Sequence, residues 1–253
     1  MRIFLKTEDE IILLRAASQL ATRALIEVGR HVVPRLALSH LRNKVVNAVM
    51  RTVPTESNSG KEALSSDTEF TFFVNGAYIE PSLEGECMLC EGDWLTVNCW
   101  VCLNGYYSFG AHTFIVGSSQ DDEPLTFTLS DMLRQVVRRA SAGHSIKEMS
   151  RTVYSLHSHD PYVLQKTFGH GVGRNRVENP ILRMNPGVND AVLLKEGMCL
   201  VIALAFKHGR SHLIKPRLMH ESTFHNPFVP FGTTVVVRPG RPEILTSFET
   251  IVK

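Results

Sequence analysis

Residues 94–117 read WLTVNCWVCLNGYYSFGAHTFIVG and carry the strongest fold signal in the sequence. It is rich in β-branched and aromatic residues, and the Asn-Gly pair at its centre favours a tight two-residue turn. We therefore predict two antiparallel strands, with Asn98 opposite Ala111 and Trp100 opposite Phe109. Because side chains alternate between the faces of a strand, these four residues share one face.

The same stretch carries no charge. From Trp94 to Gln120 the sequence has no Asp, Glu, Lys or Arg, although 21% of the whole chain is charged. Polar residues such as Thr96, Asn98 and Ser108 interrupt the segment, so it does not read as a membrane span. The missing charge therefore needs an explanation in terms of what this hairpin does.

The composition limits the class of protein, its location in the cell and the state of its cysteines. A chain of 253 residues, 43% hydrophobic and with a net charge of +2, is typical of a soluble globular protein and not of a nucleic-acid-seeking one. The N-terminal MRIFLKTEDEIILL meets an acidic cluster before any apolar run, unlike a signal peptide, so a cytoplasmic location is expected. Five cysteines are few and odd in number, which favours reduced thiols over a disulfide framework.

Helical spacing and capping residues predict four helices. The first follows the Thr7/Glu10 capping box and ends before Pro34, and the second begins at Ser39. The third and fourth are predicted over 129–142 and 145–156, the latter opened by Ser145 and Glu148.

Strand-like composition recurs on both sides of the third and fourth helices. Besides the central hairpin, the predicted strands are EFTFFVN (69–75), YVLQKTF (162–168), GMCLVIALAF (197–206), TTVVVRP (233–239) and EILTSFE (243–249). Each half thus reads as two helices followed by strands. We predict an α/β (α+β) architecture with a mostly antiparallel sheet.

The cysteines at 87, 90, 99 and 102 form two CxxC pairs, a pattern that can hold zinc. Zinc knuckles place each pair on a tight turn, whereas Cys99 and Cys102 lie in a predicted strand and point to opposite faces. We therefore expect ordinary buried thiols. Cys99 also points away from the Asn98 face, which argues against a cysteine nucleophile paired with His170.

Each of three other segments can be interpreted as a functional site or as an ordinary structural element. GHGVGR (169–174) could cradle phosphate, but no helix pattern follows it, so a glycine-rich turn that lets two backbones approach is expected. His157, His159 and Asp160 could bind a metal or simply end a helix in solvent. The basic segment 207–220 could touch nucleic acid or form an exposed strand and loop.

Several motifs then fall into one order. They are FLKTEDEI, EGDWLTVN, NGYYSFGAHTFIVG, FGHGVGRN, LKEGMCLVIA, FGTTVVV and EILTSFE. Together they resemble the bacterial type I methionine aminopeptidases, which are M24 peptidases with the pita-bread fold. The resemblance runs from about Ile3 to Glu249. It implies one pita-bread domain over 1–253, with pseudo-repeats at about 1–124 and 125–253.

The resemblance also implies a site. The family holds two divalent metal ions with two Asp, one His and two Glu. In this sequence those positions are Asn98, Phe109, His170, Ala203 and Gly232, so only His170 is retained. Two auxiliary histidines of the family fall on Glu80 and Val177.

A lone imidazole cannot offset the mutual repulsion of two adjacent divalent ions or their lost hydration. We therefore expect no metal cofactor, no catalytic residue and no peptidase activity at these vestigial positions. The uncharged hairpin is explained in the same way, since Phe, Ala and Gly pack where unpaired buried carboxylates would be costly.

Two functions remain open, besides a purely structural part in an oligomer, which the sequence does not separate from the first. The first is a binding module for a peptide or protein partner, with the ribosome as one candidate and the segments 54–67 and 207–220 as contact surfaces. The second is a divergent metalloaminopeptidase or hydrolase with one rearranged metal ion, recruited by Glu80 and His170 together with Glu178 or His112. The sequence predicts no membrane or nucleic-acid partner, and it leaves the oligomeric state open.

Overall fold

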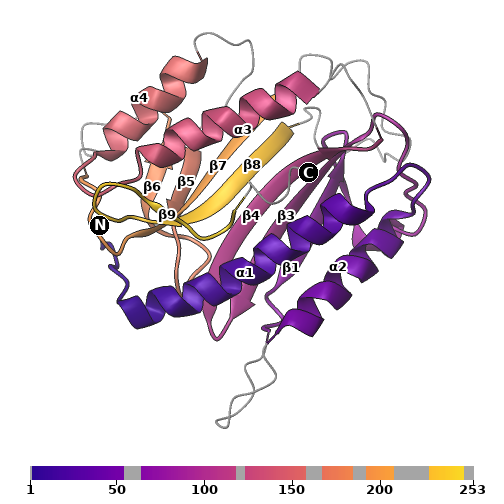
Figure 1. Ribbon diagram of the computed structural model, residues 1–253, viewed down its shortest axis with the longest axis horizontal. Coiled ribbons are helices and arrows are strands. Elements are labelled where there is room, and N and C mark those ends of the chain that lie inside the picture. The colour runs from indigo at the N-terminus through magenta and orange to yellow at the C-terminus, as the bar shows by residue number, and fades with distance from the viewer. Residues whose placement is uncertain are drawn as a thin grey trace.

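A single antiparallel sheet with helices packed against it organises the molecule (Figure 1). The computed structural model describes residues 2–53, 64–117, 123–157, 167–184, 192–207 and 228–247. Within 123–129, 156–157, 205–207 and 228–230 only the backbone is described. All structural statements below concern these residues.

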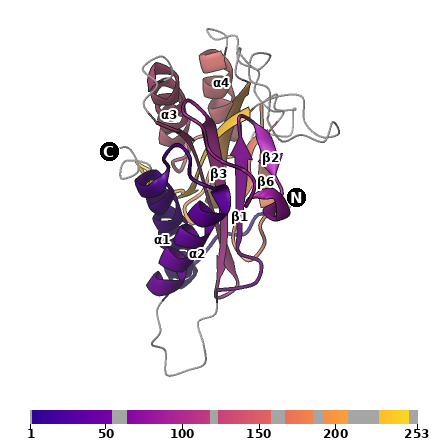
Figure 2. The same cartoon turned by 90° about the vertical axis from the view of Figure 1, so that its right-hand side faces the viewer.

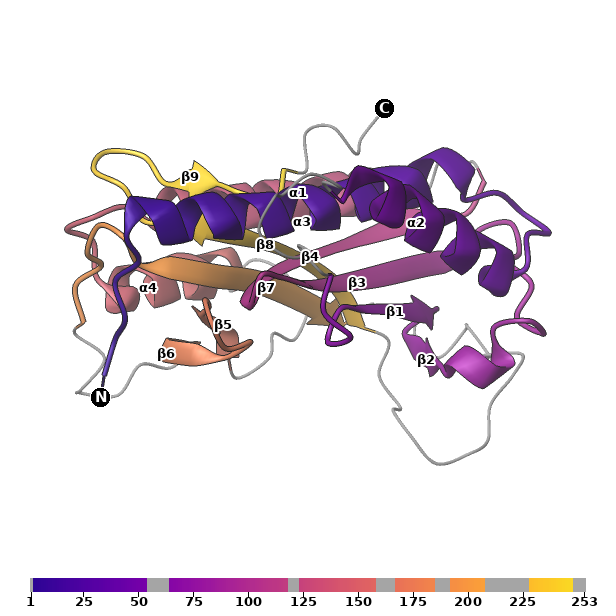
Figure 3. The ribbon, with the colours of Figure 1, turned by 90° about the horizontal axis from the view of Figure 1, so that it is seen from below.

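The helices are α1 (Glu8–His31), α2 (Leu38–Thr52), α3 (Glu123–Arg138) and α4 (Ile146–His157), with a short 3-10 helix η1 (Pro81–Leu83). Figure 3 shows α1, α2 and α3 along one side of the sheet, and Figure 2 shows α1 and α2 beside the strands from another direction. Among the described residues, no helix lies over the other face of the central strands. We call it the open face.

The predicted helices are found, with two corrections. The capping boxes Thr7/Glu10 and Ser145/Glu148 are both formed. However, α2 begins earlier than predicted, after Ala37, and Ser39 is not its cap; the backbone N–H of Ser39 instead donates to the carbonyl oxygen of Glu84. Helix α3 also begins at Glu123 and ends at Arg138, earlier at both ends than the predicted 129–142.

The strands are β1 (Glu69–Val74), β2 (Ala77–Ile79), β3 (Trp94–Leu103), β4 (Tyr106–Ile115), β5 (Thr167–Gly171), β6 (Glu178–Arg183), β7 (Cys199–Lys207), β8 (Phe228–Val236) and β9 (Glu243–Ile244). All their pairings are antiparallel, as predicted. The final strand is much shorter than the predicted 243–249. Most of the predicted strand 162–168 lies outside the described residues.

The sheet order is β2-β1-β3-β4-β8-β7-β5-β6, with β9 beside β8. Four strands from the first part of the chain thus lie beside four from the second, and β4 meets β8 at the centre. Asn104 and Gly105 both have positive φ, 51° and 75°, which is the turn that the Asn-Gly pair favours. The hairpin that opened the sequence therefore forms one side of the central seam.

Packing on the helix side follows the alternation of the strands. Cys99, Val101 and Leu95 of β3 are fully or almost fully buried in a cluster with apolar residues of α1 and α2. A second cluster joins α3 and α4 to β7 and β8. No helix among the described residues is long and apolar enough to cross a membrane.

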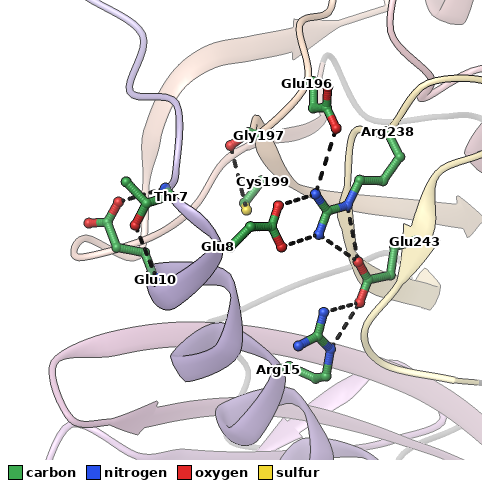
Figure 4. A network of polar contacts seen from close by, with 9 residues as sticks. All are labelled: Thr7, Glu8, Glu10, Arg15, Glu196, Gly197, Cys199, Arg238 and Glu243. Carbon is green, nitrogen blue, oxygen red and sulfur yellow. Dashed lines mark hydrogen bonds and ion pairs between the residues drawn. The ribbon is translucent and has the colours of Figure 1, made fainter.

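A polar network fixes the start of α1 to the end of the sheet (Figure 4). The guanidinium of Arg238, which follows β8, pairs with Glu8 of α1 and donates to Glu243 at 3.1–3.2 Å. Arg15 of α1 binds the same Glu243 carboxylate. The network ties α1 to β9 and so keeps this helix over the central strands.

Candidate functional site

The open face of the central hairpin carries the first two site positions. In the observed register Asn98 pairs with Ala111 and Trp100 with Phe109, so the predicted pairing is confirmed. Since Cys99 between them packs into the helix-side core, Asn98 and Trp100 point to the open face. The prediction that Cys99 points away from this face is also confirmed.

Neighbouring strands bring the other three positions to the same place. Ala111 of β4 pairs with Gly232 of β8, and Gly232 pairs with Ala203 of β7. His170 of β5 pairs with Val201, two residues before Ala203. Five strands therefore place Asn98, Phe109, His170, Ala203 and Gly232 around one point of the open face.

The ring of Phe109 occupies the centre of this group. A Cβ atom added to Gly232 would lie 2.5 Å from Cε1 of Phe109 and 3.1 Å from Cβ of Ala203. These separations are shorter than van der Waals contact, so any side chain at position 232 would collide with the ring. Phe109 thus fills the volume into which a side chain at 232 would project.

Trp100 extends the aromatic surface toward His170. Its ring centroid lies 4.8 Å from that of Phe109, in a tilted arrangement, and 6.1 Å from that of His170, with the two planes only 7° apart. We call Trp100, Phe109 and His170 the aromatic cluster. Trp100 and His170 are half-buried, and Phe109 is only 6% exposed.

The imidazole of His170 is held in one tautomer. Its Nδ1 lies 2.9 Å from the carbonyl oxygen of Gly171, and because a carbonyl only accepts, Nδ1 carries the proton. Burial lowers the pKa of His170, while the hydrogen bond to Gly171 opposes this more weakly. The ring is therefore neutral near pH 7, with Nε2 as an acceptor.

Asn98 supplies a second acceptor. Its Oδ1 is buried and has no hydrogen-bond partner among the described residues. A buried amide oxygen without a donor is costly, and such an atom in a native fold calls for a ligand, a water molecule or a functional reason.

The residues proposed for a single rearranged metal ion do not lie together. Glu80 is exposed at the start of η1, and His112 packs edge-on against Phe114 and Phe231, on the helix side of β4. Both carboxylate oxygens of Glu178 are engaged, one by Lys6 Nζ at 2.6 Å and one by the N–H of Asn175 at 3.2 Å. In the described part of the chain, no three His, Cys, Asp or Glu side chains are arranged to hold a metal ion.

The other predicted elements have mixed outcomes. All five cysteines are described and none forms a disulfide. Burial raises the pKa of Cys99 and raises that of Cys199 to about 12, so neither is a ready nucleophile.

Gly169 and Gly171 lie in β5 and not in a turn, which corrects the prediction. A Cβ on either residue would lie 2.1–2.4 Å from a backbone oxygen, so the predicted close approach is confirmed. His159, Asp160 and the segments 54–63 and 208–220 lie outside the described residues.

The family resemblance pointed to Val177 at the rim of the site but not to its neighbour Arg176. The guanidinium of Arg176 lies over the rings of Trp100 (5.6 Å) and Tyr107 (5.8 Å) and pairs with Glu69 of β1 at 2.8 Å. Val177, beside it, is 58% exposed. The partners of Arg176 are far away along the chain, Glu69 by 107 residues, and no local pattern signals such a contact.

Comparisons with known proteins place this geometry in a family. The model of metallopeptidase family M24 matches residues 12–238. A methionine aminopeptidase of Clostridium perfringens is 25% identical over 248 residues, covering 96% of this chain and 98% of that protein. One from Helicobacter pylori is 28% identical over 225 residues, covering 85% of this chain and 87% of that protein.

Solved structures agree on the fold. The methionine aminopeptidase of Thermotoga maritima superposes with a TM-score of 0.78 at 21% identity, over 97% of this chain and 100% of that chain. The prolidase of Pyrococcus furiosus gives 0.72 at 19% identity, over 96% of this chain and 65% of that one. The predicted pita-bread fold is confirmed, and since the family model spans most of the sequence, the chain belongs to metallopeptidase family M24.

Proposed function

We propose that this M24 protein has lost the dinuclear metal site and peptidase activity and acts as a binding module for a peptide or protein partner. The ring of Phe109 in the volume beside Gly232 is the observation that carries the proposal. Two divalent ions need several carboxylates, and the five family positions offer an amide, an imidazole and three groups without a ligand atom. These residues do not fit a metal pair.

The open face instead suits a ligand with apolar and hydrogen-bonding parts. The half-buried ring of Trp100 lies beside the buried ring of Phe109, and Asn98 Oδ1 and His170 Nε2 are acceptors on the same face. The relatives described above carry the name methionine aminopeptidase, so a peptide is the first class of ligand to test. In this proposal the retained scaffold recognises a chain and does not cut it.

Activity and metal content test the loss of catalysis. Protein purified without chelator should contain far less than one equivalent of zinc, manganese or iron and should not hydrolyse a Met-Ala peptide. Near-stoichiometric metal, with hydrolysis that His170→Ala abolishes, would instead establish the divergent metalloenzyme.

Partner capture tests the binding role. Affinity purification from the native cell, followed by mass spectrometry, should recover a partner with the wild type and lose it with Trp100→Ala. Tyr154→Ala, which truncates an exposed ring on α4, is the matched control and should retain the partner. Recovery of ribosomal proteins would identify the ribosome as that partner, whereas equal recovery with all three proteins would argue against binding at the open face.

A further inference from the structure

The segment from Gly173 to Glu178 crosses the rim of the aromatic cluster and is fixed at both ends. At the first end, the N–H of Tyr107 donates to the carbonyl oxygen of Gly173 at 2.8 Å. At the other, Glu178 pairs with Lys6, and these side chains are only 5% and 4% exposed. Breaking such a buried pair leaves an uncompensated charge, so this end is firmly held.

Lys6 also secures the first end. A Cβ atom on Gly173 would lie 2.2 Å from Cε of Lys6 and 2.8 Å from Oε1 of Glu178. The backbone at Gly173 therefore packs directly on the buried ion pair. One pair of charges fixes both ends of the segment.

In the middle of the segment, the N–H of Asn175 donates to Oε1 of the buried Glu178 at 3.2 Å, whereas the side chains of Arg174, Arg176 and Val177 are held differently. Arg174 is 72% exposed at its side chain and lies over Tyr106, with Glu10 no closer than 3.7 Å. Arg176 reaches across the rim to the Glu69 carboxylate and donates to the carbonyl oxygen of Asp67. Val177 makes no apolar cluster contact among the described residues and is largely exposed.

The surface contacts of Arg174 and Arg176 stabilise the middle of the segment only weakly. Arg176 and Glu69 both face solvent, and ion pairs between exposed side chains contribute little because water and salt screen them. A cation over a ring at an exposed site adds only a modest amount. The middle of the segment should therefore detach at far lower cost than its ends.

We propose that residues 174–177 form a flap that gates the open face, with Arg176 as its latch. In the closed form the guanidinium covers Trp100, which touches both Phe109 and His170. In the open form Arg176 leaves Trp100 and Glu69, while Gly173 and Glu178 stay in place. The gating role rests on the function proposed above, but the opening itself does not.

Tryptophan fluorescence tests the flap directly, because the chain has only two tryptophans. Trp94 is 4% exposed, so Trp100 dominates quenching by acrylamide. Arg176→Ala should raise the Stern–Volmer constant about twofold or more, because it removes the closed population. Arg176→Lys, which keeps the charge and loses the planar fork, should give an intermediate value.

Arg174→Ala is the matched control, since Arg174 lies over Tyr106 and not over Trp100. It should leave quenching unchanged. The proposal is wrong if Arg176→Ala leaves quenching at the wild-type value, or if Arg174→Ala raises it equally. Circular dichroism melts of both variants exclude a general loss of folding as the cause.

A salt titration of the unmodified protein provides a second test without any variant. From about 0.01 M to about 1 M salt the Debye length falls from about 30 Å to about 3 Å, so the Arg176–Glu69 pair weakens and quenching should rise. Glu69→Gln should abolish this salt dependence, and a dependence that persists in Glu69→Gln would overturn the latch. Neither result requires a ligand, so failure of the flap is distinct from failure of the binding function.

Discussion

The two faces of the β3–β4 hairpin have different tasks although they share one backbone. On the helix side, residues such as Leu95, Val97 and Cys99 are fully buried against α1 and α2. On the open face, Asn98 has a buried oxygen without a partner among the described residues. Phe109 fills the volume into which a side chain at position 232 would project. One face of the hairpin therefore builds the core that the family fold requires, while the other carries the positions on which the proposed loss of metal binding depends.

Substitution on the helix side should have the largest effect. Leu95→Ala should lower the free energy of unfolding by about 2–5 kcal/mol, because Leu95 is fully buried and its loss leaves a cavity. Urea unfolding followed by circular dichroism measures this. A loss well below about 1 kcal/mol would mean that the helix-side core does not carry the fold.

His112 on the helix side and His170 on the open face should contribute differently to the pH dependence of stability. Burial lowers the pKa of His112, on the helix side, to about 4 from its ordinary value of 6.5. Between these values the unfolded chain binds a proton at His112 and the folded chain does not, so stability is complete above pH 6.5 and falls as the pH drops toward 4.

The effect on stability at about pH 4 should be on the order of 3 kcal/mol. His112→Gln should remove most of the pH dependence of the free energy of unfolding between about pH 7 and about pH 4. His170→Gln should remove less, because the ring on the open face is less buried. An equal effect of the two substitutions would contradict the difference between the faces.

The contact between Phe109 and Gly232 should appear as a coupling free energy between substitutions at the two positions. Gly232→Ala should destabilise the wild type by about 1–3 kcal/mol, because the new methyl group meets the Phe109 ring. In the Phe109→Ala background the same substitution should be close to neutral. A double-mutant cycle of unfolding free energies measures the difference, and strict additivity would show that the ring does not fill this volume.

The smallest effect is expected at Asn98. Asn98→Ala should change the free energy of unfolding by no more than about 0.5 kcal/mol, or stabilise the fold, because it removes an oxygen that lacks a donor. Thermal and urea melts measure it. A loss as large as that of Leu95→Ala would show that Asn98 has a structural task on the open face.

The sequence predicted those parts of the fold that local rules determine. The Asn-Gly turn and the alternation of β3 and β4 need only neighbouring residues, and both were correct. The early start of α3 was missed because its first turns, with Thr126 and Thr128, resemble a strand. Pro124 was the available signal, since proline is favoured in the first turn of a helix.

Other features depend on contacts between distant segments. Ser39 donates its backbone N–H to Glu84, and Lys6 pairs with Glu178, 172 residues away. No local spacing encodes such partners. At the site, alternation alone placed Asn98 and Phe109 on one face, but the convergence of Ala203 and Gly232 on them came from the family resemblance and from the register of β7 and β8.

Calorimetric titration with Mn²⁺ or Co²⁺ tests the central claim most directly. The wild type should show no binding of two ions. The fourfold variant Asn98→Asp, Phe109→Asp, Ala203→Glu, Gly232→Glu, which restores the carboxylates and removes the ring, should bind two if it folds. Binding of two ions by the wild type would show that the dinuclear metal site has not been lost, whatever the variant does.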